Sequence, residues 1–122
     1  MFEVKVITQF AAAHQLRDFG SECENLHGHN WKIEVSLAGD TLNDIGLLVD
    51  FKEVKEATKR ILKEIDHSFL NELDYFKAHN PSSENIAVYL FEKLSSQLNN
   101  ASVKVTRVTA WESETACASY AP

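Results

Sequence analysis

Seven residues near the start of the chain combine side chains that bind or activate metal ions. The stretch is Cys23-Glu24-Asn25-Leu26-His27-Gly28-His29. Residues two apart in an extended strand point to the same face of a sheet, so the imidazoles of His27 and His29 can reach one ion. Gly28 between them has no side chain and lets the backbone approach closely. The spacing therefore predicts a metal site with histidine ligands.

A third histidine, His14, is expected to join this pair. Residues 2–13 alternate between apolar and polar side chains, which predicts a half-buried strand, and His14 continues its apolar face. A second alternating strand carries His27 and His29 and continues through Leu37. If the two strands pair antiparallel, the end of the first meets the start of the second. Three histidines around one vacant position are typical of catalytic zinc, although other divalent metals accept the same ligands; the alternative is three structural or exposed histidines.

Cys23 lies four residues before the first of these histidines, and its role has three interpretations. In the first interpretation, Cys23 is a fourth zinc ligand, which closes the site and makes it structural. In the second, it lies beside the ion as a thiolate that acts as an acid/base group or a nucleophile. The third interpretation is a small buried residue, and the loop position argues against it. Only a site with an open coordination position would permit catalysis.

Several polar residues outside this stretch could also take part in chemistry. In Asp66-His67 the carboxylate can hold the imidazole in one tautomer and make it a better base, although the residues alone favour a plain helix-terminal histidine. Glu112 ends a predicted strand, where it is either a surface residue or a group that accepts two parallel N–H bonds from a guanidine-like edge. Ser82 and Ser83 are expected to cap a helix.

The elements that must position these residues follow from periodicity and capping signals. Asp50 is expected to cap a first helix, with Glu53 as its capping-box partner. The order strand, strand, helix, helix, strand, strand predicts an α+β fold with a four-stranded antiparallel sheet and both helices on one face. Aromatic and β-branched residues are expected on the other face, so oligomerisation through the sheet is expected as well. The later elements are expected at residues 51–65, 82–98, 102–112 and 115–121.

The composition limits the class of protein. A chain of 122 residues with 44% hydrophobic residues indicates one globular domain, residues 1–122. Twelve basic and eighteen acidic residues give a net charge of −6, which argues against nucleic acid or an anionic membrane as a partner. The chain shows neither a signal peptide nor an apolar run of membrane-spanning length, so its two cysteines are expected to be free thiols in the cytoplasm.

Together these residues closely resemble the 6-pyruvoyl-tetrahydropterin synthase family, and the resemblance spans essentially the whole chain. The three residues between Cys23 and His27 are most similar to the spacing in its 6-carboxy-5,6,7,8-tetrahydropterin synthase branch. The motifs that carry the resemblance are Phe10-Ala11-Ala12-Ala13-His14, Cys23 to His29, Asp66-His67, Pro81-Ser82-Ser83-Glu84-Asn85 and Trp111-Glu112-Ser113.

The resemblance implies a fold, an assembly and a set of roles. The fold would be the tunnelling fold, or T-fold, with three subunits joined into a barrel and two trimers stacked into a hexamer whose active sites lie between subunits. The implied roles are zinc binding by His14, His27 and His29, acid/base chemistry by Cys23 and His67 with Asp66 orienting His67, and pterin binding by Glu112, Ser82 and Ser83.

The implied reaction converts 7,8-dihydroneopterin triphosphate to 6-carboxytetrahydropterin, acetaldehyde and triphosphate, in queuosine (7-deazaguanine) biosynthesis. Two other activities of the family remain alternatives, namely triphosphate elimination by a pyruvoyl synthase and side-chain cleavage by a folate-route dihydropterin aldolase. Glu24 bears on the second, because Glu24 to His29 also has the pattern Glu-x-x-His-Gly-His, typical of aldolase-type members. A structural zinc-binding module is the alternative that is not an enzyme.

Overall fold

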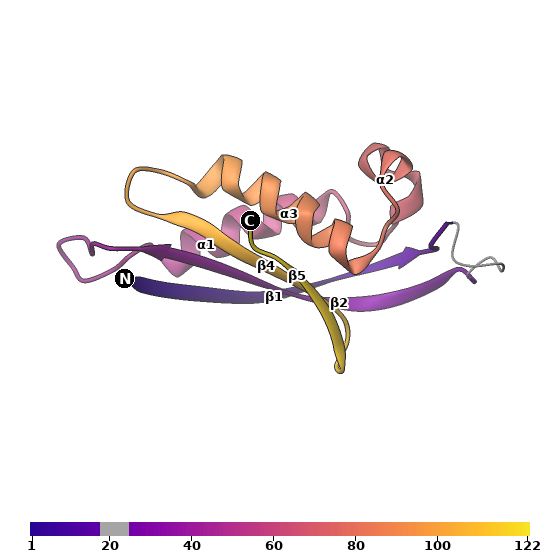
Figure 1. Cartoon of the computed structure of the whole chain (residues 1–122), viewed down its shortest axis with the longest axis horizontal. Coiled ribbons are helices and arrows are strands. Elements are labelled where there is room, and N and C mark those ends of the chain that lie inside the picture. Colours follow the sequence, from indigo (N-terminus) through magenta and orange to yellow (C-terminus); the bar gives the residue numbers. More distant parts are fainter. Residues whose placement is uncertain (18–24) are drawn as a thin grey trace.

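The structure of the chain, a computed structural model, describes residues 1–17 and 25–122. Two long strands, three α-helices and two closing strands dominate it (Figure 1). The elements are β1 (Phe2–His14), β2 (His27–Gly39), α1 (Phe51–Lys63), β3 (Ser68–Phe69), the 3-10 helix η1 (Leu70–Glu72), α2 (Asp74–Ala78), α3 (Ser83–Leu98), β4 (Lys104–Ser113) and β5 (Ala116–Tyr120). Among the described residues, no helix is long and apolar enough to cross a membrane.

The strands form one sheet in the order β3-β1-β2-β4-β5. The pairs β1–β2, β2–β4 and β4–β5 are antiparallel, and the first pairing runs from Phe2 opposite Gly39 to His14 opposite His27. All three α-helices lie on one side of the sheet (Figure 1). The α+β class, the antiparallel order of the four main strands and the single helical layer are therefore confirmed.

The structure adds one short strand and two short helices to the expected elements. β3 pairs parallel with β1, opposite Ala12 and Ala13. It has two residues, η1 has three and α2 has five, so none is long enough to show a periodic pattern. The small differences at the ends of the long elements, such as α1 ending at Lys63 rather than at Ile65, are within the usual uncertainty of element boundaries.

The core lies between the helices and one face of the sheet. Even-numbered residues of β1 and odd-numbered residues of β2 point to this face, because successive side chains of a strand alternate. Trp31 and Ile33 are completely buried there, against the apolar sides of α1 and α3. The two expected cap residues cap the long helices: an Asp50 carboxylate oxygen accepts the Lys52 N–H at 2.9 Å, and the Ser82 hydroxyl accepts the Asn85 N–H at 3.1 Å. The capping-box role of Glu53 stays a prediction.

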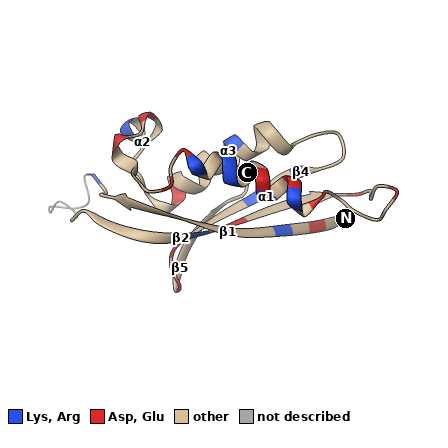
Figure 2. Ribbon diagram, turned by 180° about the vertical axis from the view of Figure 1, so that it is seen from behind, with Lys and Arg blue, Asp and Glu red and all other residues tan. Residues whose placement is uncertain are grey.

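The opposite face of the sheet is more polar than expected. Lys5 lies 3.5 Å from Glu34 across the β1–β2 pair, and Lys32 lies 3.8 Å from the same carboxylate. Acidic and basic positions follow each other along β1 near the N-terminus (Figure 2). Ile7 is 54% exposed, and the ammonium of Lys32 lies over the ring of Trp111. The expectation of an aromatic and β-branched face thus holds for Ile7 and Trp111 but is wrong for most of this surface.

Candidate metal centre

The pairing of β1 with β2 brings three histidines to one end of the sheet. His14, the last residue of β1, lies directly opposite His27, the first residue of β2. His29 lies two residues further along β2 and faces the same side as Trp31. The ring centroids are 4.6 Å apart for His14 and His27, 5.1 Å for His14 and His29, and 4.5 Å for His27 and His29. The three imidazoles therefore converge, as the strand pattern indicates.

A carboxylate from a third strand completes the group. Glu112 belongs to β4, and its Oε1 lies 3.0 Å from Nε2 of His29, 3.3 Å from Nε2 of His14 and 3.8 Å from Nε2 of His27. The candidate ligand atoms of all four residues lie within 4.8 Å of one another. His14 is buried and the other three side chains are half-buried, so the group is open toward one side.

The orientation of two of these rings fits a bound cation. Nδ1 of His14 donates a hydrogen bond to the carbonyl of Pro81 at 2.8 Å, and Nδ1 of His27 donates to the carbonyl of Asn25 at 2.7 Å. Because a carbonyl can only accept, each neutral ring carries its proton on Nδ1 and presents the lone pair of Nε2. These two Nε2 atoms lie 3.1 Å apart, so their lone pairs can both reach one cation. Backbone carbonyls that fix the tautomer are characteristic of metal-binding histidines.

His29 is held in the form that a metal ion binds. Its burial lowers its pKa below the ordinary value of 6.5; Glu112 partly offsets this, while His27 and His14 lower the pKa further. The lowered pKa favours the neutral ring at pH 7, and the buried Nε2 atom makes no well-aligned hydrogen bond among the described residues, although Oε1 of Glu112 lies 3.0 Å away. A buried nitrogen without a well-aligned hydrogen bond, beside two similarly directed nitrogens and a carboxylate, fits the donor set of zinc or a related divalent ion.

Asp66 and His67 form the expected pair on the outer edge of β1. Nδ1 of His67 lies 3.1 Å from Oδ2 of Asp66, and the other carboxylate oxygen accepts the N–H of Ala11 at 2.9 Å. This hydrogen bond from Ala11 is the main reason that the pKa of Asp66 is lowered, so the carboxylate remains charged. His67 is 82% exposed and has a backbone φ of 55°. It is not part of the histidine cluster, but a cavity of ≈ 460 Å³ is lined by both His29 and His67.

Of the remaining predicted site residues, the structure describes Ser82 and Ser83 but not Cys23. Ser82 caps α3 and Ser83 is its first residue, and both are half-buried next to Pro81, whose carbonyl orients His14. Cys23, like Glu24, lies outside the described residues. Its role as an acid/base group stays a prediction.

Two features of the centre were not predicted from the sequence. Glu112 was expected to bind substrate, and the structure also brings it to the histidines; only the register of β2 with β4 reveals this proximity. The carbonyls of Asn25 and Pro81 are backbone atoms, and no side-chain pattern identifies them as partners of His27 and His14.

Comparison with known proteins identifies the family. A sequence profile described as 6-pyruvoyl tetrahydropterin synthase matches residues 3–122. A 6-carboxy-5,6,7,8-tetrahydropterin synthase from Aquifex aeolicus is 32% identical, over 82% of this chain and 76% of that protein. A dihydroneopterin monophosphate aldolase from Pyrococcus furiosus is 35% identical, over 84% of this chain and 82% of that protein.

A solved structure agrees with the sequence relatives. The structure of 6-pyruvoyl tetrahydropterin synthase from Caenorhabditis elegans superimposes with a TM-score of 0.88 at 29% identity, covering 99% of this chain and 95% of that one. This likeness confirms the tunnelling fold that the motifs indicate. With a profile match over nearly the whole length and close structural agreement, the chain belongs to the 6-pyruvoyl tetrahydropterin synthase family of enzymes.

Proposed function

We propose that the chain is a zinc-dependent 6-carboxy-5,6,7,8-tetrahydropterin synthase that acts on 7,8-dihydroneopterin triphosphate and supplies queuosine biosynthesis in the cytoplasm. The observation that carries the proposal is the convergence of the ligand atoms of His14, His27 and His29 on one point, beside Glu112. The Aquifex aeolicus relative supports the choice of product, because its name states this activity.

The proposed mechanism assigns a proton-transfer role to each side of a flat substrate. His14, His27 and His29 would hold the ion, which would polarise the side-chain hydroxyls of the substrate when bound. Asp66 accepts the Nδ1 proton of His67 and so leaves Nε2 of that ring free to take a proton. Cys23 would serve as the second acid/base group. Activity that persists in both Cys23→Ala and His67→Ala variants would contradict this two-base mechanism.

Glu112 would bind the pterin edge in this mechanism. A carboxylate can accept two parallel N–H bonds from the 2-amino group and N3 of a pterin. Its side chain is 34% exposed, so it faces the open side of the histidine group rather than the core. Ser82 and Ser83 would lie beside the ring.

An assembly with active sites between subunits is part of the proposal. Within residues 1–17 and 25–122, β1 has no strand partner on its outer edge before Ala12, and β5 ends the sheet on the other side. Two such open edges allow sheets of neighbouring copies to join. His67 lies at the open edge of β1, where it would face the neighbouring copy. We therefore propose a hexamer built from two trimers.

Product analysis tests the proposed reaction. The protein, loaded with zinc, is incubated with 7,8-dihydroneopterin triphosphate with and without a chelator, and the products are identified by mass spectrometry. We expect 6-carboxytetrahydropterin and acetaldehyde only without the chelator. Retention of triphosphate on the product, or the same rate with the chelator, would overturn the proposal.

A dihydropterin aldolase is the second candidate. The relative from Pyrococcus furiosus is named as a dihydroneopterin monophosphate aldolase, and Glu24 begins the pattern Glu-x-x-His-Gly-His. In the same experiment, this activity would release a glycolaldehyde phosphate species and no acetaldehyde. A pyruvoyl synthase would release triphosphate without acetaldehyde.

A structural zinc-binding module remains as a function that needs no catalysis. In that case Cys23 would close the site, and zinc absorption spectra would show a sulfur neighbour at about 2.3 Å. The Asp66–His67 pair, which is held by two hydrogen bonds to Ala11, would have no role in such a module.

A further inference from the structure

Two asparagine side chains hold the chain where it leaves β1. Oδ1 of Asn71 accepts the Gln15 N–H at 2.9 Å, and Nδ2 of Asn71 donates to the Gln15 carbonyl at 2.7 Å. Asn80 binds Arg17 in the same way, with distances of 2.8 Å and 2.9 Å. Each amide thus binds both the N–H and the C=O of one residue, as the residue of a neighbouring antiparallel strand would.

These amides continue a line of partners along the outer edge of β1. The N–H of Ala11 donates to Asp66, its carbonyl accepts the His67 N–H at 2.6 Å, and β3 pairs with the next two residues. The pairing of β1 with β2 ends at His14. Segment 66–80 therefore supplies strand-like partners beyond the end of the strand, first from its backbone and then from two side chains.

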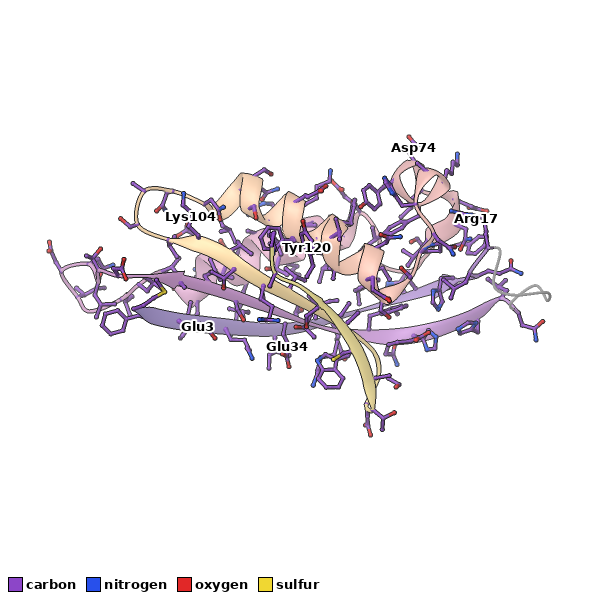
Figure 3. All side chains as sticks on the ribbon, viewed as in Figure 1. Glu3, Arg17, Glu34, Asp74, Lys104 and Tyr120 are labelled. Atoms are coloured by element: carbon purple, nitrogen blue, oxygen red, sulfur yellow. The ribbon has the colours of Figure 1, made fainter. Side chains whose placement is uncertain are left out.

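The second asparagine is also connected to the histidine cluster. Pro81 follows Asn80 directly, and its carbonyl accepts the Nδ1 proton of His14, which is 1% exposed. The Asn80 carbonyl accepts the side-chain N–H of Asn85 at 2.8 Å, which ties it to the first turn of α3. Arg17 lies at the end of the molecule that carries α2, and its guanidinium donates to the Phe76 carbonyl at 2.6 Å (Figure 3).

We propose that Asn71 and Asn80 are positioning residues for the histidine cluster. They hold the backbone immediately after His14 while the neighbouring Pro81 carbonyl holds its ring, so Nε2 of His14 is fixed toward the other two imidazoles. This proposal rests on the proposed function in one respect, namely that His14 binds the metal. Groups that orient a ligand typically change metal affinity by roughly 10–100-fold when they are removed.

Asn80→Ala is the main test, and Asn100→Ala is its matched control. Asn100 also binds two backbone N–H groups through its side chain, those of Ser102 and Val103, but it lies in the turn between α3 and β4 at the opposite end of the molecule (Figure 1). Zinc affinity is measured by competition with a chromophoric chelator. We expect a loss of roughly 10–100-fold for Asn80→Ala and less than about twofold for Asn100→Ala at a similar decrease in Tm.

A second variant and a spectroscopic readout separate positioning from general destabilisation. Asn80→Asp keeps the acceptor for the Arg17 N–H and loses the donor to its carbonyl, so its zinc affinity should lie between those of the wild type and Asn80→Ala. In the Co²⁺-loaded protein, the visible absorption bands should change for both Asn80 variants and not for Asn100→Ala. Equal losses of affinity in Asn80→Ala and Asn100→Ala, or an unchanged affinity in Asn80→Ala, would overturn the proposal.

Measurements on the metal-free wild type distinguish this proposal from the proposed function. We expect slow hydrogen exchange of the Gln15 and Arg17 amides and a ¹⁵N signature of a His14 ring that carries a proton on Nδ1. Fast exchange at both amides, or a His14 ring without a proton on Nδ1, overturns the positioning role even if a variant fails to fold. Slow exchange with no zinc binding by the wild type would instead contradict the metal-dependent function.

Discussion

At the residue scale, the histidines could be predicted because their positions obey simple strand geometry. His27 and His29 share a face by alternation, and His14 continues the buried face of the partner strand. The proximity of Glu112 to them could not be predicted, because it depends on the register between β2 and β4, which includes an irregularity between Ser36 and Leu37. Strand register is set by packing across the whole sheet rather than by any local pattern.

The Glu112→Gln variant should show whether Glu112 is a metal ligand or binds the substrate. If Glu112 binds the pterin edge, the variant keeps its zinc affinity within a few-fold and loses activity mainly through a higher KM, because the amide cannot accept both N–H bonds. Zinc affinity is measured by chelator competition, and KM by product formation. A large loss of zinc affinity would show instead that the carboxylate is a metal ligand.

The lowered pKa of His29 predicts a pH dependence of the metal-free protein. The unfolded chain takes up a proton at this residue near the ordinary value of 6.5, whereas the folded chain resists protonation because the ring is buried. The free energy of unfolding should therefore decrease as the pH falls below 6.5 and level off below the pKa of the folded state. Tm measured in chelator from pH 8 to pH 5 tests this, and His29→Gln should show a flatter profile.

At the element scale, the long strands were predicted correctly because their side chains alternate, and the long helices because each has a full apolar period and a capping residue. β3, η1 and α2 were missed because segments of two to five residues cannot show such a period. They matter nonetheless: Asn71, which holds Gln15, is a residue of η1, and α2 lies between it and Asn80, which holds Arg17. Their course is determined by contacts with β1, which local sequence does not encode.

The cap of α3 gives a prediction at this scale. Ser82→Ala removes the acceptor for the Asn85 N–H and should lower the free energy of unfolding by about 1 kcal/mol. Ser82→Asp keeps an acceptor and should lose much less, and Ser83→Ala should be nearly neutral for stability. Urea unfolding measures all three. Equal stabilities of Ser82→Ala and Ser82→Asp would contradict the capping role.

At the scale of the whole molecule, the order of elements indicated the fold class, whereas the outer face of the sheet was misjudged. Glu34 forms ion pairs with Lys5 of β1 and with Lys32 of its own strand on this face, so burial of apolar surface is not a sufficient reason for assembly. The open edges of β1 and β5 provide a different reason for assembly, since unpaired backbone groups favour strand addition. The single domain, the hexamer and the sites between subunits stay predictions.

Ile7→Pro tests assembly through the edge of β1. The N–H of Ile7 points away from β2, because it alternates in step with the N–H of Ala11, which reaches Asp66. Proline there should spare the β1–β2 hydrogen bonds and block an added strand. We expect a hexamer for the wild type and for Ile7→Val, and smaller species for Ile7→Pro, by analytical ultracentrifugation with circular dichroism as the folding control. A hexameric Ile7→Pro variant would contradict edge pairing.

The left-handed backbone of His67 has a consequence for mutagenesis. A φ of 55° suits glycine and asparagine and strains branched side chains such as valine and threonine. Saturation of this position should therefore give two separable phenotypes: glycine and asparagine would remove the imidazole from an otherwise native loop, while β-branched replacements would also distort the turn. Only the glycine and asparagine variants therefore measure the contribution of the imidazole ring alone.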